Sequence, residues 1–90
     1  MTNLNADTAA SLRVWVIENL FDGHAPPGFD DDSDLIADGV MDSLAIMRTL
    51  SHLEQDHGIA VDPGDIVPQH FSSIRALARL VAAKGQRGFA

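Results

Sequence analysis

Residues 35–44 read LIADGVMDSL and mark the point where a long acidic connection gives way to an amphipathic helix. Gly39 allows a tight turn just before this helix, and either Asp42 or Ser43 can cap its first turn. A helix N-terminus presents free backbone N–H groups and the positive end of the helix dipole, which favour a phosphate. Ser43 is therefore either a simple cap or the acceptor of a phosphate-linked group, with Asp42 helping to hold a Mg²⁺-bound donor.

The composition predicts one domain spanning residues 1–90, with residues 1–6 and 86–90 as flexible tails. The chain is 46% hydrophobic, which is enough for a core, and its 90 residues favour a binding or carrier role over an enzyme. A net charge of −7 with only six Lys and Arg residues disfavours nucleic acid and favours basic protein surfaces as partners. We expect a monomer.

The cysteine count and the apolar runs narrow the location and the chemistry. The chain has no cysteine, so any thiol chemistry requires a prosthetic group. No apolar run reaches the length of a membrane span, and the first residues lack the pattern of a secretory signal. We therefore expect a cytoplasmic protein that does not bind membranes.

Apolar spacing predicts three sizeable helices and hence an all-α bundle. The first helix runs from residue 7 or 8 to about residue 20, the second from 42 or 43 to about 57, where Gly58 stops it. The last begins after a cap at Ser72 or Ser73 and closes with Lys84 and Gly85. A single short turn at residues 65–67, ended by Pro68, precedes it.

The same spacing predicts which side chains face the core. The expected core positions are Leu12, Val14, Trp15, Val16, Ile17 and Leu20 on the first helix, Ile46, Leu50, Leu53 and His57 on the second, and Phe71, Ile74, Leu77, Ala78 and Val81 near the end. Arg13 and Glu18 are expected to point outward. Leu44, Met47, Arg48 and Ser51 share an outer row on the second helix, which either forms a contact surface or covers the neighbouring loop.

The connection at residues 21–41 is too long for an ordinary loop and suggests an ordered crossover, with a helical turn near residues 33–36. Its four aspartates, Asp30, Asp31, Asp32 and Asp34, raise the possibility of a calcium loop. An EF-hand loop starting at residue 30 requires Gly at position 35 and Glu at position 41, where this chain has Leu35 and Met41. We therefore interpret the aspartates as a solvated acidic rim.

The histidines do not build a recognisable catalytic or metal site. The G-x-S-x-G pattern of a serine hydrolase is absent. His52 and His57 are five residues apart, so they do not share a helix face as a pair of metal ligands would. We expect His57 to pack in the core, and His52 and His70 to lie at the surface.

With these elements placed, the chain resembles the acyl carrier and peptidyl carrier protein family over residues 35–81. The centre of the match is Asp42-Ser43-Leu44, similar to the D-S-L at which this family attaches 4′-phosphopantetheine. Residues 35–41 resemble the run that precedes this site in stand-alone carriers. Leu53-Glu54 resembles a later L-E pair, and residues 65–74 resemble the passage through a short third helix into the fourth.

The resemblance implies a four-helix bundle with three main helices, a short third helix and a long first loop. It also implies that Ser43 carries phosphopantetheine, whose thiol holds a cargo as a thioester, and that Asp42 assists the phosphopantetheinyl transferase. On this basis the protein has no catalysis of its own. The positions implied to meet partner enzymes are Val40, Met41, Leu44, Met47, Arg48 and Ser51.

Two departures from the fatty-acid carriers indicate a narrower type. Arg48 stands where those carriers usually have an acid, and Val40-Met41 replaces a smaller residue before the D-S pair. The G-V-M-D-S form resembles discrete carriers of amino acids or aryl acids. We therefore expect loading by an adenylating ligase and delivery to tailoring or condensing enzymes, as in nonribosomal peptide and other secondary metabolite biosynthesis. A polyketide or fatty-acyl carrier remains an alternative, as does a helical interaction module in which Ser43 is only a cap.

Overall fold

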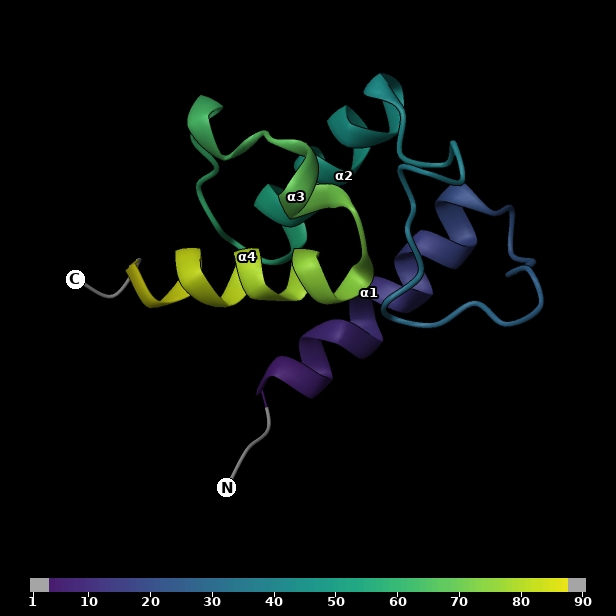
Figure 1. Ribbon diagram of the computed structural model, residues 1–90. Helices are drawn as coiled ribbons and strands as arrows, with labels where there is room; N and C mark the ends of the chain where they lie inside the picture. Colours follow the sequence, from purple (N-terminus) through teal and green to yellow (C-terminus); the bar gives the residue numbers. More distant parts are fainter. Residues whose placement is uncertain (1–3, 88–90) are drawn as a thin grey trace.

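The structure is a computed structural model that describes residues 4–87. Over this range the chain forms four α-helices and one 3₁₀ turn, with no strand (Figure 1). The order is α1 Leu4–Leu20, α2 Ser43–Asp56, η1 Pro63–Asp65, α3 Pro68–Phe71 and α4 Ile74–Arg87. The predicted all-α, four-helix bundle is confirmed. No helix within residues 4–87 has the length and apolar character needed to cross a membrane.

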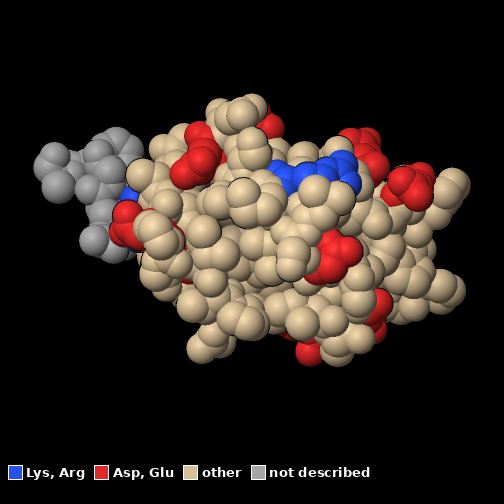
Figure 2. Space-filling model, turned by 90° about the horizontal axis from the view of Figure 1, so that it is seen from above, with Lys and Arg blue, Asp and Glu red and all other residues tan. Residues whose placement is uncertain are grey.

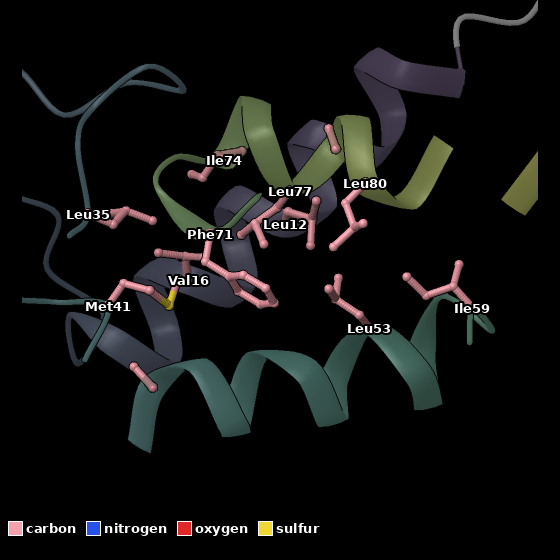
Figure 3. Packing of buried hydrophobic residues seen from close by; sticks show 12 residues of the cluster. Leu12, Val16, Leu35, Met41, Leu53, Ile59, Phe71, Ile74, Leu77 and Leu80 are labelled. Carbon is pink, nitrogen blue, oxygen red and sulfur yellow. The ribbon is translucent and has the colours of Figure 1, made fainter. Parts of the chain in front are cut away.

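One apolar core joins the helices and the long connection (Figure 3). Phe71 of α3 is completely buried, and it points between α2 below and α1 and α4 above in the view of Figure 3. Leu35 and Met41 reach the same core from the connection. The completely buried hydrophobic side chains are Leu12, Val16, Leu35, Leu53, Phe71, Ile74 and Leu77. The long connection is thus part of the packed interior and is fixed to the bundle.

Helix α1 is longer than the sequence predicts and faces the core along a narrower stripe. It begins at Leu4, so the predicted start at residue 7 or 8 is wrong and residues 4–6 are helical. Of the tails predicted at residues 1–6 and 86–90, residues 86–87 also belong to a helix, α4, and residues 1–3 and 88–90 lie outside the described residues. Val14 is 55% exposed, which corrects its assignment to the core. Its neighbours Leu12 and Val16 are completely buried, and Ala9, Trp15 and Leu20 pack against the same core, so Val14 lies outside the core-facing side of α1.

Helix α2 is rotated relative to the predicted core row. Ala45, Thr49 and Leu53 are buried, whereas Ile46, Leu50 and His57 are only half-buried. The prediction was based on hydrophobicity and therefore chose the row that contains the large side chains Ile46 and Leu50. The small Ala45 and the Thr49 side chain instead lie inward, and the Thr49 hydroxyl is 3.7 Å from the sulfur of Met41. Met41, arriving from the connection, fills the space that these smaller residues leave.

The passage from α2 to α4 also differs from the prediction. Pro68 begins α3 instead of ending a turn, because a proline at the first helical position needs no N–H partner. Ser73 is confirmed as the cap of α4, since its hydroxyl accepts the Ala76 N–H at 3.0 Å. α4 continues past Gly85 to Arg87, so Lys84 does not close the helix.

Lys84 is a buried cation with a structural role. Its side chain is 7% exposed, and its ammonium contacts both Asp62, at 3.2 Å, and Asp65. The hydrogen bond that Lys84 donates to Asp65 raises the pKa of the lysine, and Asp62 adds to this effect. The pair of carboxylates caps η1 and ties the passage between α2 and α3 to α4.

The packing predicts a sharp contrast between two leucines of α2. Replacing Leu53 with Ala removes a completely buried side chain and should lower the free energy of unfolding by about 2–5 kcal/mol. Replacing Leu44, which is 69% exposed, should change it by less than about 0.5 kcal/mol. Urea unfolding followed by circular dichroism measures both. Equal losses in the two variants would contradict the orientation of α2.

Candidate functional site

The N-terminus of α2 is capped by Asp42. Asp42 has extended backbone angles, φ −87° and ψ −175°, and its Oδ1 accepts the Ala45 N–H at 2.9 Å. This contact satisfies one of the N–H groups that a helix start leaves free. Ser43 is therefore the first helical residue and not the cap. The interpretation of Ser43 as a simple cap is wrong, and its hydroxyl has no structural task at the helix end.

Ser43 differs from most other serines of the chain in its surroundings. Its side chain is exposed, and the structure gives its hydroxyl no hydrogen-bond partner among the described residues. Four of the other serines, Ser33, Ser51, Ser72 and Ser73, are engaged in hydrogen bonds. Ser11 is exposed but lies within the length of α1, where the backbone N–H groups are already bonded. Ser43 is thus the exposed, free hydroxyl at a helix N-terminus.

The turn before the cap is fixed by the backbone of Leu35. The Leu35 carbonyl accepts the N–H groups of Val40, at 3.0 Å, and Met41, at 2.9 Å. Gly39 has φ +78°, a left-handed conformation that a residue with a side chain rarely adopts. The turn spans residues 35–39, later than the helical turn predicted at 33–36. This turn fixes the position of Asp42 at the start of α2.

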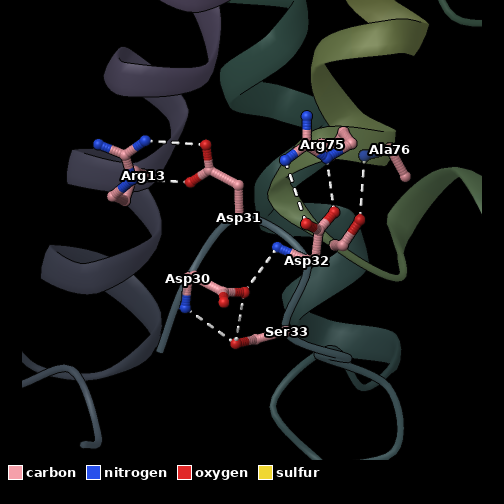
Figure 4. Close-up of polar contacts among 8 residues, drawn as sticks. Arg13, Asp30, Asp31, Asp32, Ser33, Arg75 and Ala76 are labelled. Carbon is pink, nitrogen blue, oxygen red and sulfur yellow. Dashed lines mark hydrogen bonds and ion pairs between the residues drawn. The ribbon is translucent and has the colours of Figure 1, made fainter. Parts of the chain in front are cut away.

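Two arginines hold the acidic part of the connection against the helices (Figure 4). Arg13 of α1 donates two hydrogen bonds to Asp31, at 2.7 and 2.8 Å. Arg75 of α4 donates two to Asp32, at 2.5 and 3.1 Å. Bidentate pairs of this kind are among the stronger charge-assisted contacts. Asp31 and Asp32 therefore anchor the loop, and only part of the predicted acidic rim is simply solvated.

The contacts with the two arginines lower the pKa values of Asp31 and Asp32. The hydrogen bonds from Arg13 hold the pKa of Asp31 below its usual value, although partial burial opposes the effect. Arg75 lowers the pKa of Asp32 in the same way. Asp30 and Asp34 instead accept backbone N–H groups within the connection, from Asp32 and from Ile36 and Ala37. Among the described residues, no group of three or more His, Asp or Glu side chains is arranged to hold a metal ion.

An exposed face on α2 lies directly after Ser43. Leu44 is 69% exposed and Met47 is 58% exposed, while Arg48 and Ser51 are also at the surface. Arg48 has no salt-bridge partner among the described side chains, in contrast to Arg13 and Arg75. We call Leu44, Met47, Arg48 and Ser51 the outer face of α2. The alternative in which these side chains cover the loop is wrong for the two apolar ones, because most of their surface is free.

Two further positions predicted to meet partners behave differently. Val40 is half-buried beside the start of α2. Met41 is only 3% exposed and contacts Thr49, so it cannot meet a partner and the prediction for it is wrong. Sequence adjacency to the D-S pair suggested a surface role, but the turn at residues 35–39 directs this side chain inward.

A shallow hollow adjoins the outer face. It has a volume of about 240 Å³ and lies between the end of α1, the connection and the first turns of α2. Its walls include Asn19, Asp22, Val40, Leu44 and Arg48. In the view of Figure 2 the surface is mostly uncharged, with scattered acidic side chains and few basic ones.

A family model described as the phosphopantetheine attachment site matches residues 21–81, from the start of the connection to the last helix. The match covers well over half of the chain. The chain belongs to this family. The resemblance to carrier proteins is thereby confirmed at the level of the family, and the prosthetic group is 4′-phosphopantetheine, attached covalently. A comparison with curated proteins finds no match.

The site fits this prosthetic group. Attachment requires a hydroxyl that a transferase can reach, and the Ser43 side chain is exposed and unengaged inside the matched range. Family members are carriers that present a substrate to partner enzymes and in general do not catalyse reactions themselves. When bound, the group supplies a terminal thiol, which this cysteine-free chain lacks.

The ion pairs that Arg13 and Arg75 form with the connection were not predicted from the sequence. Each arginine is far in sequence from its aspartate, and no spacing rule links residues at such a separation.

The Asp42 cap predicts a graded effect on stability. Replacing Asp42 with Ala should lower the free energy of unfolding by about 1 kcal/mol, because the Ala45 N–H loses its partner. Asn and Ser keep a capping oxygen, so Asp42→Asn and Asp42→Ser should recover most of the loss. Thermal unfolding of the three variants measures this order. A full loss in Asp42→Ser would show that charge, and not the cap, stabilises the helix start.

Proposed function

We propose that this protein is a carrier whose 4′-phosphopantetheine is attached to Ser43. The proposal rests on one observation about two adjacent residues: Asp42 caps α2, and the Ser43 hydroxyl is free. Asp42 makes the capping contact to Ala45, which leaves the Ser43 hydroxyl exposed and free at the first helical position. Membership in the phosphopantetheine attachment family supplies the chemistry for that hydroxyl.

The helix end favours the attached phosphate. The first N–H groups of α2 point toward the N-terminus, and the helix dipole places partial positive charge there. This effect is modest, roughly 0.3–1 kcal/mol at an exposed site. We further propose that Asp42 assists the phosphopantetheinyl transferase, because it is exposed beside Ser43 and only its Oδ1 accepts the capping N–H.

The outer face of α2 is proposed to meet the partner enzymes. Leu44 and Met47 offer apolar contact area within one turn of Ser43, and Arg48 offers a cation without an internal partner among the described side chains. Exposed apolar side chains beside a functional residue commonly mark an interaction surface. The partners are a phosphopantetheinyl transferase, an adenylating ligase, and downstream tailoring or condensing enzymes. Val40 borders the hollow next to this face and is proposed to contribute at its edge.

The proposed cargo is an amino acid or another carboxylic acid activated by an adenylating ligase. Support comes from Arg48, whose positive charge on the outer face of α2 gives this helix a different recognition character from the acidic helix of fatty-acid carriers. The G-V-M-D-S sequence before and at the site supports the same type. The protein is then a discrete carrier that delivers its cargo to tailoring or condensing enzymes.

Attachment at Ser43 is tested by intact mass. Coexpression with a phosphopantetheinyl transferase of broad specificity should add the mass of one phosphopantetheinyl group to the wild-type protein. Ser43→Ala should remain unmodified while unfolding like the wild type. Ser11→Ala is the control, since Ser11 is also exposed but lies on α1, outside the outer face of α2, and the variant should leave modification complete. A modified Ser43→Ala variant, or an unmodified wild type, would refute the proposal.

The type of cargo is tested with the holo protein. We expect it to accept an amino acid or aryl acid from at least one member of a panel of stand-alone adenylating ligases, read as a mass gain that hydroxylamine reverses. A malonyl transferase should give no gain under the same conditions. Loading by the malonyl transferase alone would assign the protein to polyketide or fatty-acyl synthesis instead.

A further inference from the structure

A second hollow lies between α3 and α4, apart from the site at Ser43. It has a volume of about 480 Å³, which is within the range of small-molecule sites, and its walls come from η1, α3 and α4. It shares no residue with the outer face of α2 or with the hollow beside that face. Its chemistry can therefore be considered separately from the attachment of the prosthetic group.

The α4 side of this hollow is apolar. Ala76, Leu80 and Ala83 follow one another at helical spacing and therefore lie on one face of α4. Leu80 is nearly buried, whereas Ala83 is exposed. Because the two alanines carry only a methyl group, they leave open the space between α4 and α3. This floor can cover a short aliphatic chain.

One part of the wall is a closed ion pair. Lys84 and Asp65 both line the hollow, and the buried ammonium of Lys84 contacts Asp65 and, from outside the hollow, Asp62. The Asp65 carboxylate is therefore occupied, and Lys84 adds no free positive charge. Among the residues that line the hollow, Arg79 is the charge that this pair does not balance.

Arg79 is an exposed cation of the hollow. It has no salt-bridge partner among the described side chains. Its charge contributes to the low pKa of Asp32, but that carboxylate already accepts two hydrogen bonds from Arg75. A guanidinium presents a fork of N–H donors that matches the two oxygens of a carboxylate. Arg79 is thus available to bind an anion.

His70 lies across the hollow on α3. Its Nδ1 is 2.8 Å from the carbonyl oxygen of Asp65, which can only accept, so the neutral ring carries its proton on Nδ1. Nε2 is then an acceptor without a hydrogen-bond partner among the described groups, and a polar substituent of a ligand can bind it. His70 was expected at the surface and is half-buried. His52, also expected there, is only 8% exposed, because Trp15 stacks on it.

We propose that the hollow between α3 and α4 binds a small monocarboxylate, with its carboxylate on Arg79 and its short apolar chain over Ala76, Leu80 and Ala83. Charge complementarity favours this class of ligand. The chain as a whole carries a net charge of −7, whereas in this hollow an unpaired cation adjoins an apolar floor. An amine of the same shape would face the like charge of Arg79. The inference goes beyond the proposed function and does not depend on it.

Titration of the full chain, in its apo form, with hexanoate tests the proposal. Amide resonances of residues 76–83 in proton–nitrogen correlation spectra should shift saturably at low ionic strength. The expected dissociation constant is on the order of 1 mM, because the ligand is small and the cation is exposed. Hexylammonium is the charge control and should leave these resonances in place. No saturable shift with hexanoate, or an equal response to both probes, would overturn the proposal.

Two substitutions separate the contribution of the charge from that of the apolar floor. Arg79→Gln should weaken hexanoate binding about ten-fold, because the carboxylate loses its charge-assisted hydrogen bonds. Arg48→Gln is its control, since it removes an exposed arginine outside the hollow and should leave binding unchanged. Ala83→Leu fills the floor without changing the charge and should weaken binding to a similar extent. Ala10→Leu, at an exposed position of α1, is the control for the added side chain.

All four substituted positions are exposed, so each variant should keep the wild-type fold, which circular dichroism checks. Undiminished hexanoate binding in Arg79→Gln or in Ala83→Leu would show that the ligand lies elsewhere and would overturn the proposal. Hexanoate shifts centred on α2 would do the same.

Discussion

The position of the functional helix depends on one buried residue of the connection, Leu35. Its side chain is completely buried, its N–H donates to the Ser72 carbonyl at 2.7 Å, and its own carbonyl closes the turn that leads into α2. A connection of this length would otherwise have many conformations to lose on folding. Because Leu35 fixes it to the junction of α3 and α4, Asp42 arrives at α2 in a single orientation.

Some cations of this protein form ion pairs within the fold, and others are exposed at the surface. Arg13, Arg75 and Lys84 are each bound to aspartates that lie elsewhere in the chain, so most of the described cations serve the fold. The net charge of −7 is therefore carried by a surface with little free positive charge. Arg48 and Arg79 have no salt-bridge partner among the described side chains, and Arg48 lies on the helix that begins at Ser43. A partner that approaches this helix meets apolar side chains and one positive charge.

The sequence was informative where local rules apply. Helical spacing identified three main helices, and Gly58 and Ser73 marked helix boundaries correctly, since caps and stops depend on neighbouring residues. The short D-S-L pattern singled out Ser43, because the three residues of this pattern are contiguous in the chain. Local chemistry could not decide which of two adjacent residues caps α2. That depends on the direction in which the connection arrives.

The errors share a physical origin in contacts between distant segments. Met41 and His52 were expected at the surface, but each is covered by a residue from elsewhere, Thr49 and Trp15 respectively. Lys84 fitted the rule for a cation at a helix C-terminus, although it serves aspartates about 20 residues earlier. A helical repeat identifies a stripe of apolar residues, and only the packing partners decide which edge of the stripe is buried.

We propose that Ser43, exposed beside the Asp42 cap, carries the prosthetic group. The most direct measurement is peptide fragmentation of the holo protein by tandem mass spectrometry, which assigns the added group to a single residue. We expect the group on Ser43 and on none of the other serines. A group located on Ser11, Ser51 or any other residue would contradict it.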